Sequence, residues 1–115
     1  MLESSQVSVR RRAQRANPRF LFSGRVMLFE AERTEVTAGR ALGISLSGLA
    51  AVLPRDLSLG QTVELEFVFP LSSDALHLRA IVRNRIGDRY GFEFVSLSTD
   101  HRDAIERGCA GLAPL

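Results

Sequence analysis

The feature that most constrains this chain is an alternation of apolar and polar residues between residues 20 and 95. Every second side chain of a β-strand points to the same face, so this period predicts strands that bury one face and expose the other. In TVELEFVF, residues 62–69, the two glutamates fall on the exposed face. The predicted inward-facing residues of this segment are Val63, Leu65, Phe67 and Phe69.

The same alternation occurs in FLFSGRVMLF (20–29), LHLRAIVR (76–83) and YGFEFV (90–95). Their predicted inward-facing residues are Phe20, Phe22, Val26, Leu28, Leu76, Leu78, Ala80, Val82, Tyr90, Phe92 and Phe94. Turn-forming residues separate the segments. The turn segments are LPRDLSLG (53–60), PLSSD (70–74) and IGDR (86–89). Short strands joined by such turns are typical of a small antiparallel barrel.

Only the C-terminal region has a helical pattern. Ile105 and Cys109 lie four residues apart on one helical face, and acidic residues precede them at the predicted positive end of the helix. The candidate caps are Ser98 or Thr99 at the start and Gly108 or Gly111 at the end. We therefore predict a mainly β protein, with a small, split-barrel-like antiparallel barrel of about six strands and one C-terminal helix.

The length of 115 residues is that of one ordinary domain. We expect a single barrel domain over residues 15–115, preceded by a flexible basic segment over residues 1–14. The longest uncharged run, residues 41–54, is shorter than the roughly 20 apolar residues of a membrane span. No apolar segment flanks the N-terminal arginines as in a secretory signal. These features predict a cytoplasmic protein, in which the single Cys109 serves helix packing.

Positive charge is concentrated at the N-terminus. Residues 1–19 hold five arginines against one glutamate, a net charge of +4, whereas residues 20–115 carry −2. All fifteen basic residues are arginine, which binds phosphate in a bidentate manner and stacks on flat rings. Because the rest of the chain is net acidic, a nonspecific nucleic-acid-binding protein is disfavoured.

The sequence lacks the arrangements that catalysis requires. Neither His77 nor His101 has a second ligand at metal-like spacing, and no GxSxG, P-loop or GxGxxG motif occurs. The carboxylates are scattered rather than paired. We therefore expect no enzymatic activity, no metal and no cofactor.

The segment LGISLSGLAAVLP, residues 42–54, has two serines and two glycines where a buried strand would normally carry branched side chains. One interpretation is a tight turn between two strands, with the upstream arginines forming a solvated tail. The other is a strand end that serves as a binding surface, in which a serine hydroxyl donates to a ligand and glycine permits positive φ or close backbone approach.

Together with the arginines upstream, this segment resembles the PilZ domain family of cytoplasmic bacterial cyclic di-GMP receptors. The family has an RxxxR motif before the first strand and a [DN]xSxxG motif after the second. Here Arg15 and Arg19, in RANPR, give the first motif, and Arg11 and Arg15 have the same spacing. The second motif falls on Gly43, Ser45 and Gly48, of which the last two match.

The resemblance implies a cyclic di-GMP site formed by Arg15, Arg19, Ser45 and Gly48, with Arg11, Arg12 and Gly43 as secondary candidates. The guanidinium groups would bind the phosphates and stack on the guanines. Glycine at position 43 lacks the side-chain acceptor of Asp or Asn, a loss of about 1.5–3 kcal/mol, or roughly one to two decades of affinity. Two functions stay open: a weak cyclic di-GMP receptor that acts through a partner protein, or a degenerate domain that only contacts other proteins.

Overall fold

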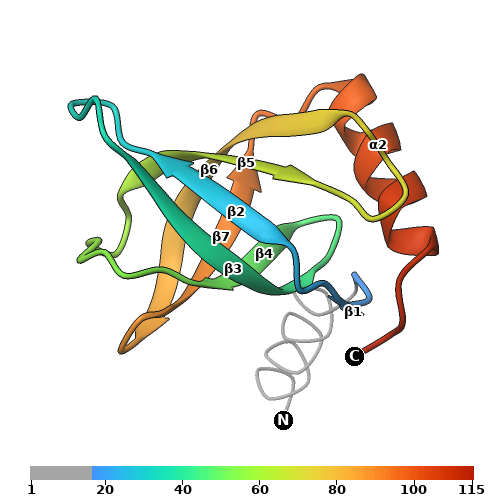
Figure 1. Ribbon diagram of the computed structural model, residues 1–115, viewed down its shortest axis with the longest axis horizontal. Helices are drawn as coiled ribbons and strands as arrows, with labels where there is room; N and C mark the ends of the chain where they lie inside the picture. The colour runs from blue at the N-terminus through green and yellow to red at the C-terminus, as the bar shows by residue number, and fades with distance from the viewer. Residues whose placement is uncertain (1–16) are drawn as a thin grey trace, which may run out of the picture.

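The computed structural model describes residues 17–115, so the predicted flexible segment over residues 1–14 lies outside the described range. Residues 17–115 form seven strands and one helix (Figure 1). These are β1 (Phe20–Leu21), β2 (Arg25–Phe29), β3 (Val36–Ile44), β4 (Gly48–Val52), β5 (Thr62–Val68), β6 (Ala75–Ile86), β7 (Arg89–Val95) and α2 (Thr99–Ala110).

Six strands close into an antiparallel barrel. Their order around the barrel is β3, β2, β5, β6, β7 and β4, and β4 pairs with β3 to complete the ring. β1 lies outside the ring and pairs with the end of β3, where Phe20 is opposite Ile44 and Leu21 is opposite Gly43. The predicted fold, a mainly β protein with a six-stranded barrel and one C-terminal helix, is confirmed.

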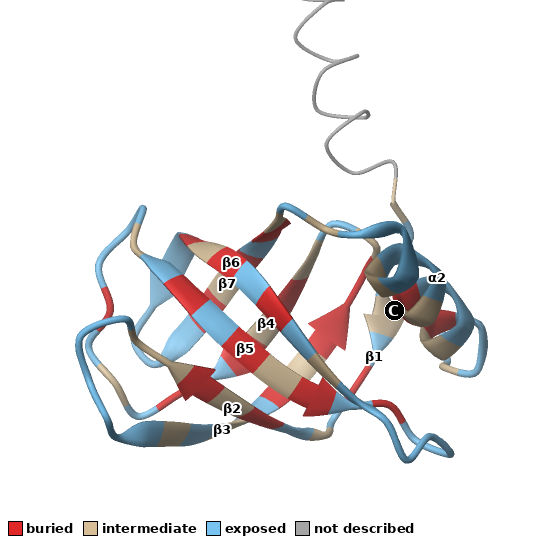
Figure 2. Ribbon diagram, turned by 90° about the horizontal axis from the view of Figure 1, so that it is seen from above, coloured by how far each residue is buried: buried red, intermediate tan, exposed pale blue. Residues whose placement is uncertain are grey.

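The alternating residues fill the barrel. On β5, Val63, Leu65 and Phe67 are buried, whereas Glu64 is exposed, and Figure 2 shows this alternation as red and lighter bands along the strand. Burying each such side chain contributes about 1.5–3 kcal/mol. Among the predicted inward-facing residues, Phe20 and Leu76 are half-buried and pack against the core, and all the others are buried.

The predicted strand at residues 20–29 is divided in two. β1 pairs with the end of β3, and β2 pairs with the beginning of β3 and with β5. Between them the chain bends sharply enough that a Cβ on Gly24 would lie 2.9 Å from the Phe22 ring. The bend places Phe22 in the core and separates β1 from the barrel wall.

α2 lies across one end of the barrel (Figure 1). Its N-cap is Ser98, whose hydroxyl accepts a hydrogen bond from the backbone N–H of His101 at 3.1 Å. A Cβ on Gly108 would lie 2.3 Å from the ring of Phe69, the residue after β5, so only glycine lets the helix approach this ring so closely. Gly111 is the C-cap.

The helix contributes two side chains to the core, Ile105 and Cys109, as the sequence predicts. Burial raises the pKa of the Cys109 thiol above its ordinary value. A buried, protonated thiol is unreactive, in agreement with the predicted packing role. No helix among residues 17–115 is long enough and apolar enough to cross a membrane.

Candidate functional site

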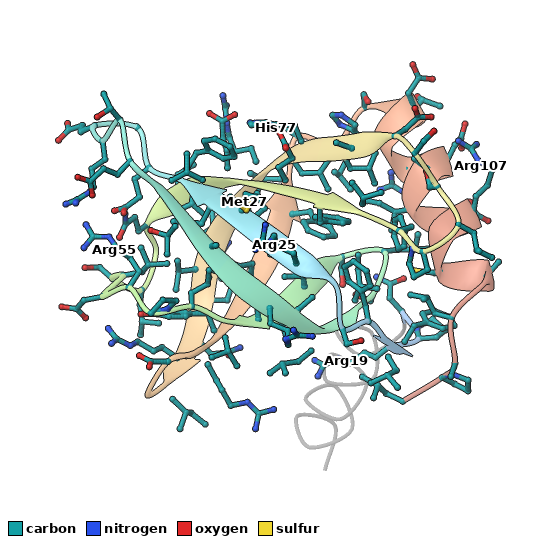
Figure 3. The ribbon with its side chains drawn as sticks, in the orientation of Figure 1. Arg19, Arg25, Met27, Arg55, His77 and Arg107 are labelled. Carbon is teal, nitrogen blue, oxygen red and sulfur yellow. The ribbon has the colours of Figure 1, made fainter. Side chains whose placement is uncertain are left out.

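Arg19 lies immediately before β1, and its side chain is exposed (Figure 3). Its backbone carbonyl accepts a hydrogen bond from the N–H of Leu115 at 2.9 Å. Among the ion pairs of residues 17–115, none involves the Arg19 guanidinium. That group is therefore available to an anion. The other arginines that the sequence predicts for the site, Arg11, Arg12 and Arg15, lie outside the described residues.

Ser45 begins the turn between β3 and β4 and is only 7% exposed. Its hydroxyl accepts a hydrogen bond from the Ser47 N–H at 3.2 Å and lies 3.1 Å from the Ser47 hydroxyl. Its own N–H donates to the Gly48 carbonyl at 2.9 Å. The tight turn, which was one of the two interpretations of the sequence, is therefore present. Ser47 is exposed at its tip and is a further hydroxyl that the sequence analysis did not single out.

Gly48 starts β4 at the crossing with β7. A Cβ at this position would lie 2.1 Å from the Phe92 carbonyl oxygen, far inside van der Waals contact. Of the glycines in residues 17–115, only Gly60 and Gly87 have positive φ, so close approach, not positive φ, explains Gly48. This glycine is needed for the contact between two strands whether or not a ligand binds.

Gly43 lies just after a β-bulge in β3, opposite Leu21 of β1 on one side and Ala50 of β4 on the other. On β4, Leu49 and Ala51 face inward, so Ala50 between them faces outward. Gly43 is opposite Ala50 and therefore belongs to the outer face of the barrel. It is nevertheless buried. A Cβ on Gly43 would lie 2.8 Å from Leu115 Cδ1 and 3.3 Å from the Phe20 carbonyl oxygen, which shows what covers it.

Small residues continue this outer face across β4 and β7. Gly43 is opposite Ala50, and Ala50 is opposite Gly91. The side chain of Asn84 on β6 lies over Gly91, because a Cβ on that glycine would lie 2.5 Å from both amide atoms. The row offers backbone and an amide group to a flat ligand. Ala50, Asn84 and Gly91 were not predicted, since only the strand register brings them to Gly43.

The candidate site therefore brings together four of the predicted residues at one end of β3, with Arg19 and Gly43 joined through β1, and Ser45 and Gly48 joined through the turn. We call this region the motif end of the barrel. It places the exposed Arg19 guanidinium and the exposed Ser47 hydroxyl at the same end of β3 as the buried Ser45 and Gly43.

The other end of β3 carries a charged network, which we call the ion-pair end. Arg55 Nε donates to Glu30 Oε2 at 2.6 Å, and Gln61 Nε2 donates to Glu30 Oε1 at 2.9 Å. The hydrogen bond from Arg55 holds the pKa of the Glu30 carboxyl below its ordinary value. Beside this pair, the Arg85 guanidinium donates to Asp56 and lowers the pKa of that carboxyl. These side chains connect loops that are far apart in the sequence.

Tyr90 anchors the same end from inside the barrel. Its hydroxyl donates to the Arg55 carbonyl and accepts from the Leu57 N–H at 3.0 Å. The Arg85 guanidinium lies 5.1 Å from the centre of the Tyr90 ring, within cation–π range. All of these groups are paired with one another, so the ion-pair end has a structural role.

His77 lies on the outer face of β6 between two glutamates of β5. Its Nε2 is 2.6 Å from Glu64 Oε1 and its Nδ1 is 3.3 Å from Glu66 Oε2. Burial acts to lower the pKa of His77, but hydrogen bonds to Glu66 and Glu64 outweigh it and raise that pKa above its ordinary value. Residues 17–115 hold no group of three potential ligands arranged for a metal ion.

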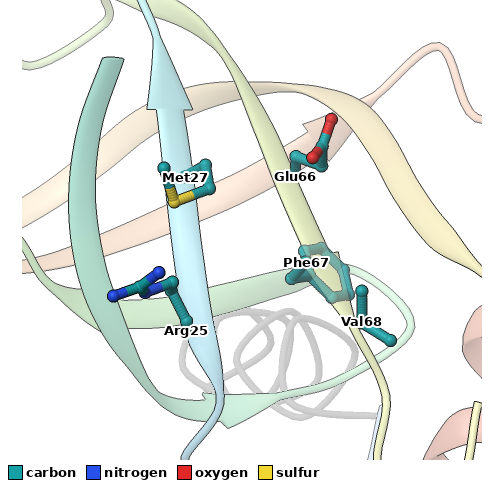
Figure 4. Close-up of a pocket in the computed structure, with 5 residues that line it drawn as sticks. All are labelled: Arg25, Met27, Glu66, Phe67 and Val68. Carbon is teal, nitrogen blue, oxygen red and sulfur yellow. The ribbon is translucent and has the colours of Figure 1, made fainter. Parts of the chain in front are cut away.

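A small hollow of about 180 Å³ lies at β2 and β5, lined by Arg25, Met27, Glu66, Phe67 and Val68 (Figure 4). Pockets that enclose drug-sized ligands usually measure about 300–1,000 Å³. A cyclic dinucleotide does not fit in this hollow, and none of the predicted site residues lines it.

The fold, together with two short motifs in this order around β1 and β3, defines the class of protein. The chain belongs to the PilZ domain family, which matches residues 10–111. The match includes all of the arginines and small residues discussed above. No curated protein matches the sequence.

Solved structures share this fold at low sequence identity. The PilZ domain of CeSA from a cellulose-synthesizing bacterium is 20% identical, with a TM-score of 0.66 over 81% of this chain and 95% of that chain. The PilZ domain of YcgR from Escherichia coli, solved with c-di-GMP, is 18% identical, with a TM-score of 0.68 over 84% and 88%. The inhibitor of motility MotI/DgrA from Bacillus subtilis is 17% identical, with a TM-score of 0.68 over 82% and 48%.

Proposed function

We propose that this protein is a cyclic di-GMP-binding regulatory domain, with its ligand on the motif end of the barrel. The observation that carries the proposal is the convergence of Arg19, Gly43 and the Ser45–Gly48 turn on one end of β3. In sequence order these are the second arginine of the first PilZ motif and the three positions of the second motif, two of which match the family pattern. The related domain of YcgR, solved with c-di-GMP, adds support.

The chemistry of the motif end suits such a ligand. A cyclic dinucleotide presents two phosphates and two flat guanines, and arginine both pairs with phosphate and stacks on purines. Arg19 supplies one such group, and Arg15 is proposed to supply another, with Arg11 and Arg12 nearby in the sequence. Ser47 and Ser45 supply hydroxyls. The row Gly43, Ala50 and Gly91 has little or no side chain of its own, and Leu115 and Asn84 lie over its two glycines.

Gly43 predicts weak binding. A side-chain acceptor at this position would add a hydrogen bond to the ligand, and its absence removes about 1.5–3 kcal/mol. We propose that the bound form acts by contacting an effector protein in the cytoplasm. The competing function is a domain that contacts its partner without any nucleotide, and it is favoured by the missing acceptor.

Calorimetric titration with cyclic di-GMP separates the two functions. We expect saturable binding by the parent protein and a loss of at least about tenfold in affinity for Arg19→Ala, the effect of one charge-assisted contact. Arg79→Ala is the matched control, because Arg79 is an exposed arginine on β6, across the barrel from β3. Equal weakening by both variants would indicate nonspecific attraction of the nucleotide to positive charge.

A gain-of-function variant tests the missing acceptor directly. Gly43→Asp should strengthen binding by roughly tenfold, equivalent to 1.4 kcal/mol. Gly43 does not have positive φ, so its backbone conformation allows a side chain, which would displace the Leu115 side chain. In an Arg19→Ala background the gain should shrink, because contacts to one ligand are coupled. If the parent and the Asp variant both fold and neither binds, the partner-only function replaces the receptor.

A further inference from the structure

After α2 the chain turns back across the motif end. The Leu21 N–H donates to the Ala113 carbonyl at 2.8 Å, and the Leu115 N–H donates to the Arg19 carbonyl at 2.9 Å. Phe20 and Pro114 form a β-bridge between these two bonds. Residues 112–115 therefore lie as a short extra strand against β1, and we call them the strap.

The strap covers the one motif position at which the sequence departs from the family pattern. Leu115 Cδ1 lies 2.8 Å from the place that a Cβ on Gly43 would occupy. Real Cβ atoms do not come this close to another carbon, so any residue larger than glycine would displace the Leu115 side chain from its contact with position 43. Glycine at position 43 thus lacks a side chain that could contact the ligand. At the same time it leaves space for the Leu115 side chain, and in this sense it seats the strap.

The strap is held weakly. Leu115 is 70% exposed, Ala113 and Pro114 are exposed, and only Leu112 packs partly against the core. A segment with few buried apolar contacts and a few exposed backbone hydrogen bonds opens at low free-energy cost. The strap can therefore leave the motif end while the barrel and α2 stay folded.

We infer that the strap is a gate that competes with cyclic di-GMP for the motif end, seated by Gly43 and released when the ligand binds. The inference rests on the proposed function. With the strap closed, Leu115 covers Gly43, and the chain around Arg19 is bonded to the strap. The observed affinity then equals the affinity of the open form multiplied by the fraction of molecules that are open.

Two variants open the gate by different chemistry. Leu115→Ser removes the side chain that covers Gly43, and Gly43→Ala removes the seat without adding a hydrogen-bond acceptor. Each should tighten cyclic di-GMP binding at least about threefold, and the double variant should bind no tighter than the better single one, because both remove the same contact. Leu59→Ser is the matched control, since Leu59 is 66% exposed, in the loop before β5. It should leave the affinity unchanged.

Amide hydrogen exchange follows the gate directly. The Leu21 and Leu115 amides, both bonded across the strap, should exchange faster when cyclic di-GMP is saturating, while the Leu65 amide in β5 stays protected. The gate is overturned if the parent binds the ligand but Leu115→Ser and Gly43→Ala bind no tighter, or if Leu21 and Leu115 stay protected at saturation. Either of these results leaves the proposed function intact. Absence of binding by the parent, both gate variants and Gly43→Asp removes the proposed function and the gate together.

Discussion

The two ends of β3 are stabilised by different means. At the ion-pair end, Glu30 connects to Arg55 and Gln61 through side chains that are mostly buried. At the motif end, backbone hydrogen bonds and residues with little or no side chain hold β1, the β3–β4 turn and the strap together. The ends are about 26 Å apart, since a strand rises about 3.3 Å per residue.

The difference shows where a ligand can act. Side-chain pairs at the ion-pair end already satisfy one another, so a ligand could bind there only by breaking them. The motif end leaves the Arg19 guanidinium free of ion pairs within residues 17–115, and we propose that its main-chain contacts to the strap are exchanged for contacts to a ligand. One end fixes the barrel, and the other is adaptable. Four substitutions test this comparison, and we order them by the size of the expected effect.

The largest effect is expected at Gly48, the part of the motif end where two strands are in close backbone contact. Gly48→Ala would place a Cβ 2.1 Å from the Phe92 carbonyl oxygen, and backbone cannot move aside easily. We expect a loss of about 3 kcal/mol in the free energy of unfolding, measured by urea denaturation. Gly111→Ala is the control, because its Cβ would meet nothing closer than 3.7 Å. Unchanged stability of Gly48→Ala would mean that the close strand contact is not required.

Glu30→Gln tests the ion-pair end. The side chains of Glu30 and Arg55 are only 12% and 28% exposed, so we expect a loss of about 1.5 kcal/mol at pH 7. Glu35→Gln should cost less than about 0.5 kcal/mol, because Glu35 is 80% exposed in its pair with Arg33. Equal effects of the two substitutions would mean that burial does not strengthen the Glu30 network.

The Glu30 effect should also depend on pH. Arg55 lowers the pKa of Glu30 in the folded state, so the folded protein binds this proton less tightly than the unfolded chain does. The stabilisation is present above the unfolded pKa, about 4.3, and is lost as the pH falls through the folded pKa. The difference between parent and Glu30→Gln in chemical denaturation should therefore shrink in acid.

Ser45→Ala tests whether the motif turn needs its hydroxyl. The side chain is 7% exposed and accepts the Ser47 N–H, so its removal leaves that donor without its partner. We expect a loss of about 1 kcal/mol in urea denaturation. Ser47→Ala removes only an exposed hydroxyl and should cost less. A larger effect at Ser47 would show that the turn depends on the exposed residue instead.

The smallest effect is expected at His77, whose ring packs beside Phe29 on the outer face of the barrel. Its pKa is raised in the folded state, so its stabilisation is present below the unfolded pKa and is lost as the pH rises through the folded pKa. His77 and its glutamates are at least 40% exposed, so we expect about 0.5 kcal/mol or less. The stability difference between parent and His77→Gln, measured from pH 5 to pH 8, should decrease as the pH rises. A difference that grows with pH would contradict the two ion pairs.

Strands could be predicted from the sequence where burial alone determines the pattern of apolar and polar residues. β5 alternates without interruption because one face meets the core and the other meets solvent. The segment VTAGRALGI was not identified as a full strand. Its small residues are required by close contacts with neighbouring strands, not by an alternation between core and solvent. A Cβ on Gly39, for example, would lie 2.4 Å from the Val52 carbonyl oxygen. Such close contacts between strands leave no periodic signal.

The candidate site was predictable only in outline. The order of the motifs placed Arg19, Ser45 and Gly48 around one strand, and the structure brings them to one end of β3. The partners of Gly43 could not be predicted, because its cover comes from Leu115 and its neighbours from the registers of β4 and β7. The bulge between Ala41 and Gly43 changes the register. A sequence does not reveal such a shift before the strands are paired.

The chain contains one tyrosine, one cysteine and no tryptophan. The tyrosine and the cysteine lie at different ends of the barrel. Tyr90 is bonded inside the ion-pair end, so intrinsic fluorescence reports on that end alone. Cys109 is buried under α2, and its carbonyl accepts the N–H of Leu112, the first residue of the strap. The rate at which a thiol reagent labels Cys109 therefore reports on opening beneath α2. The unmodified protein thus carries a separate optical or chemical probe for each end.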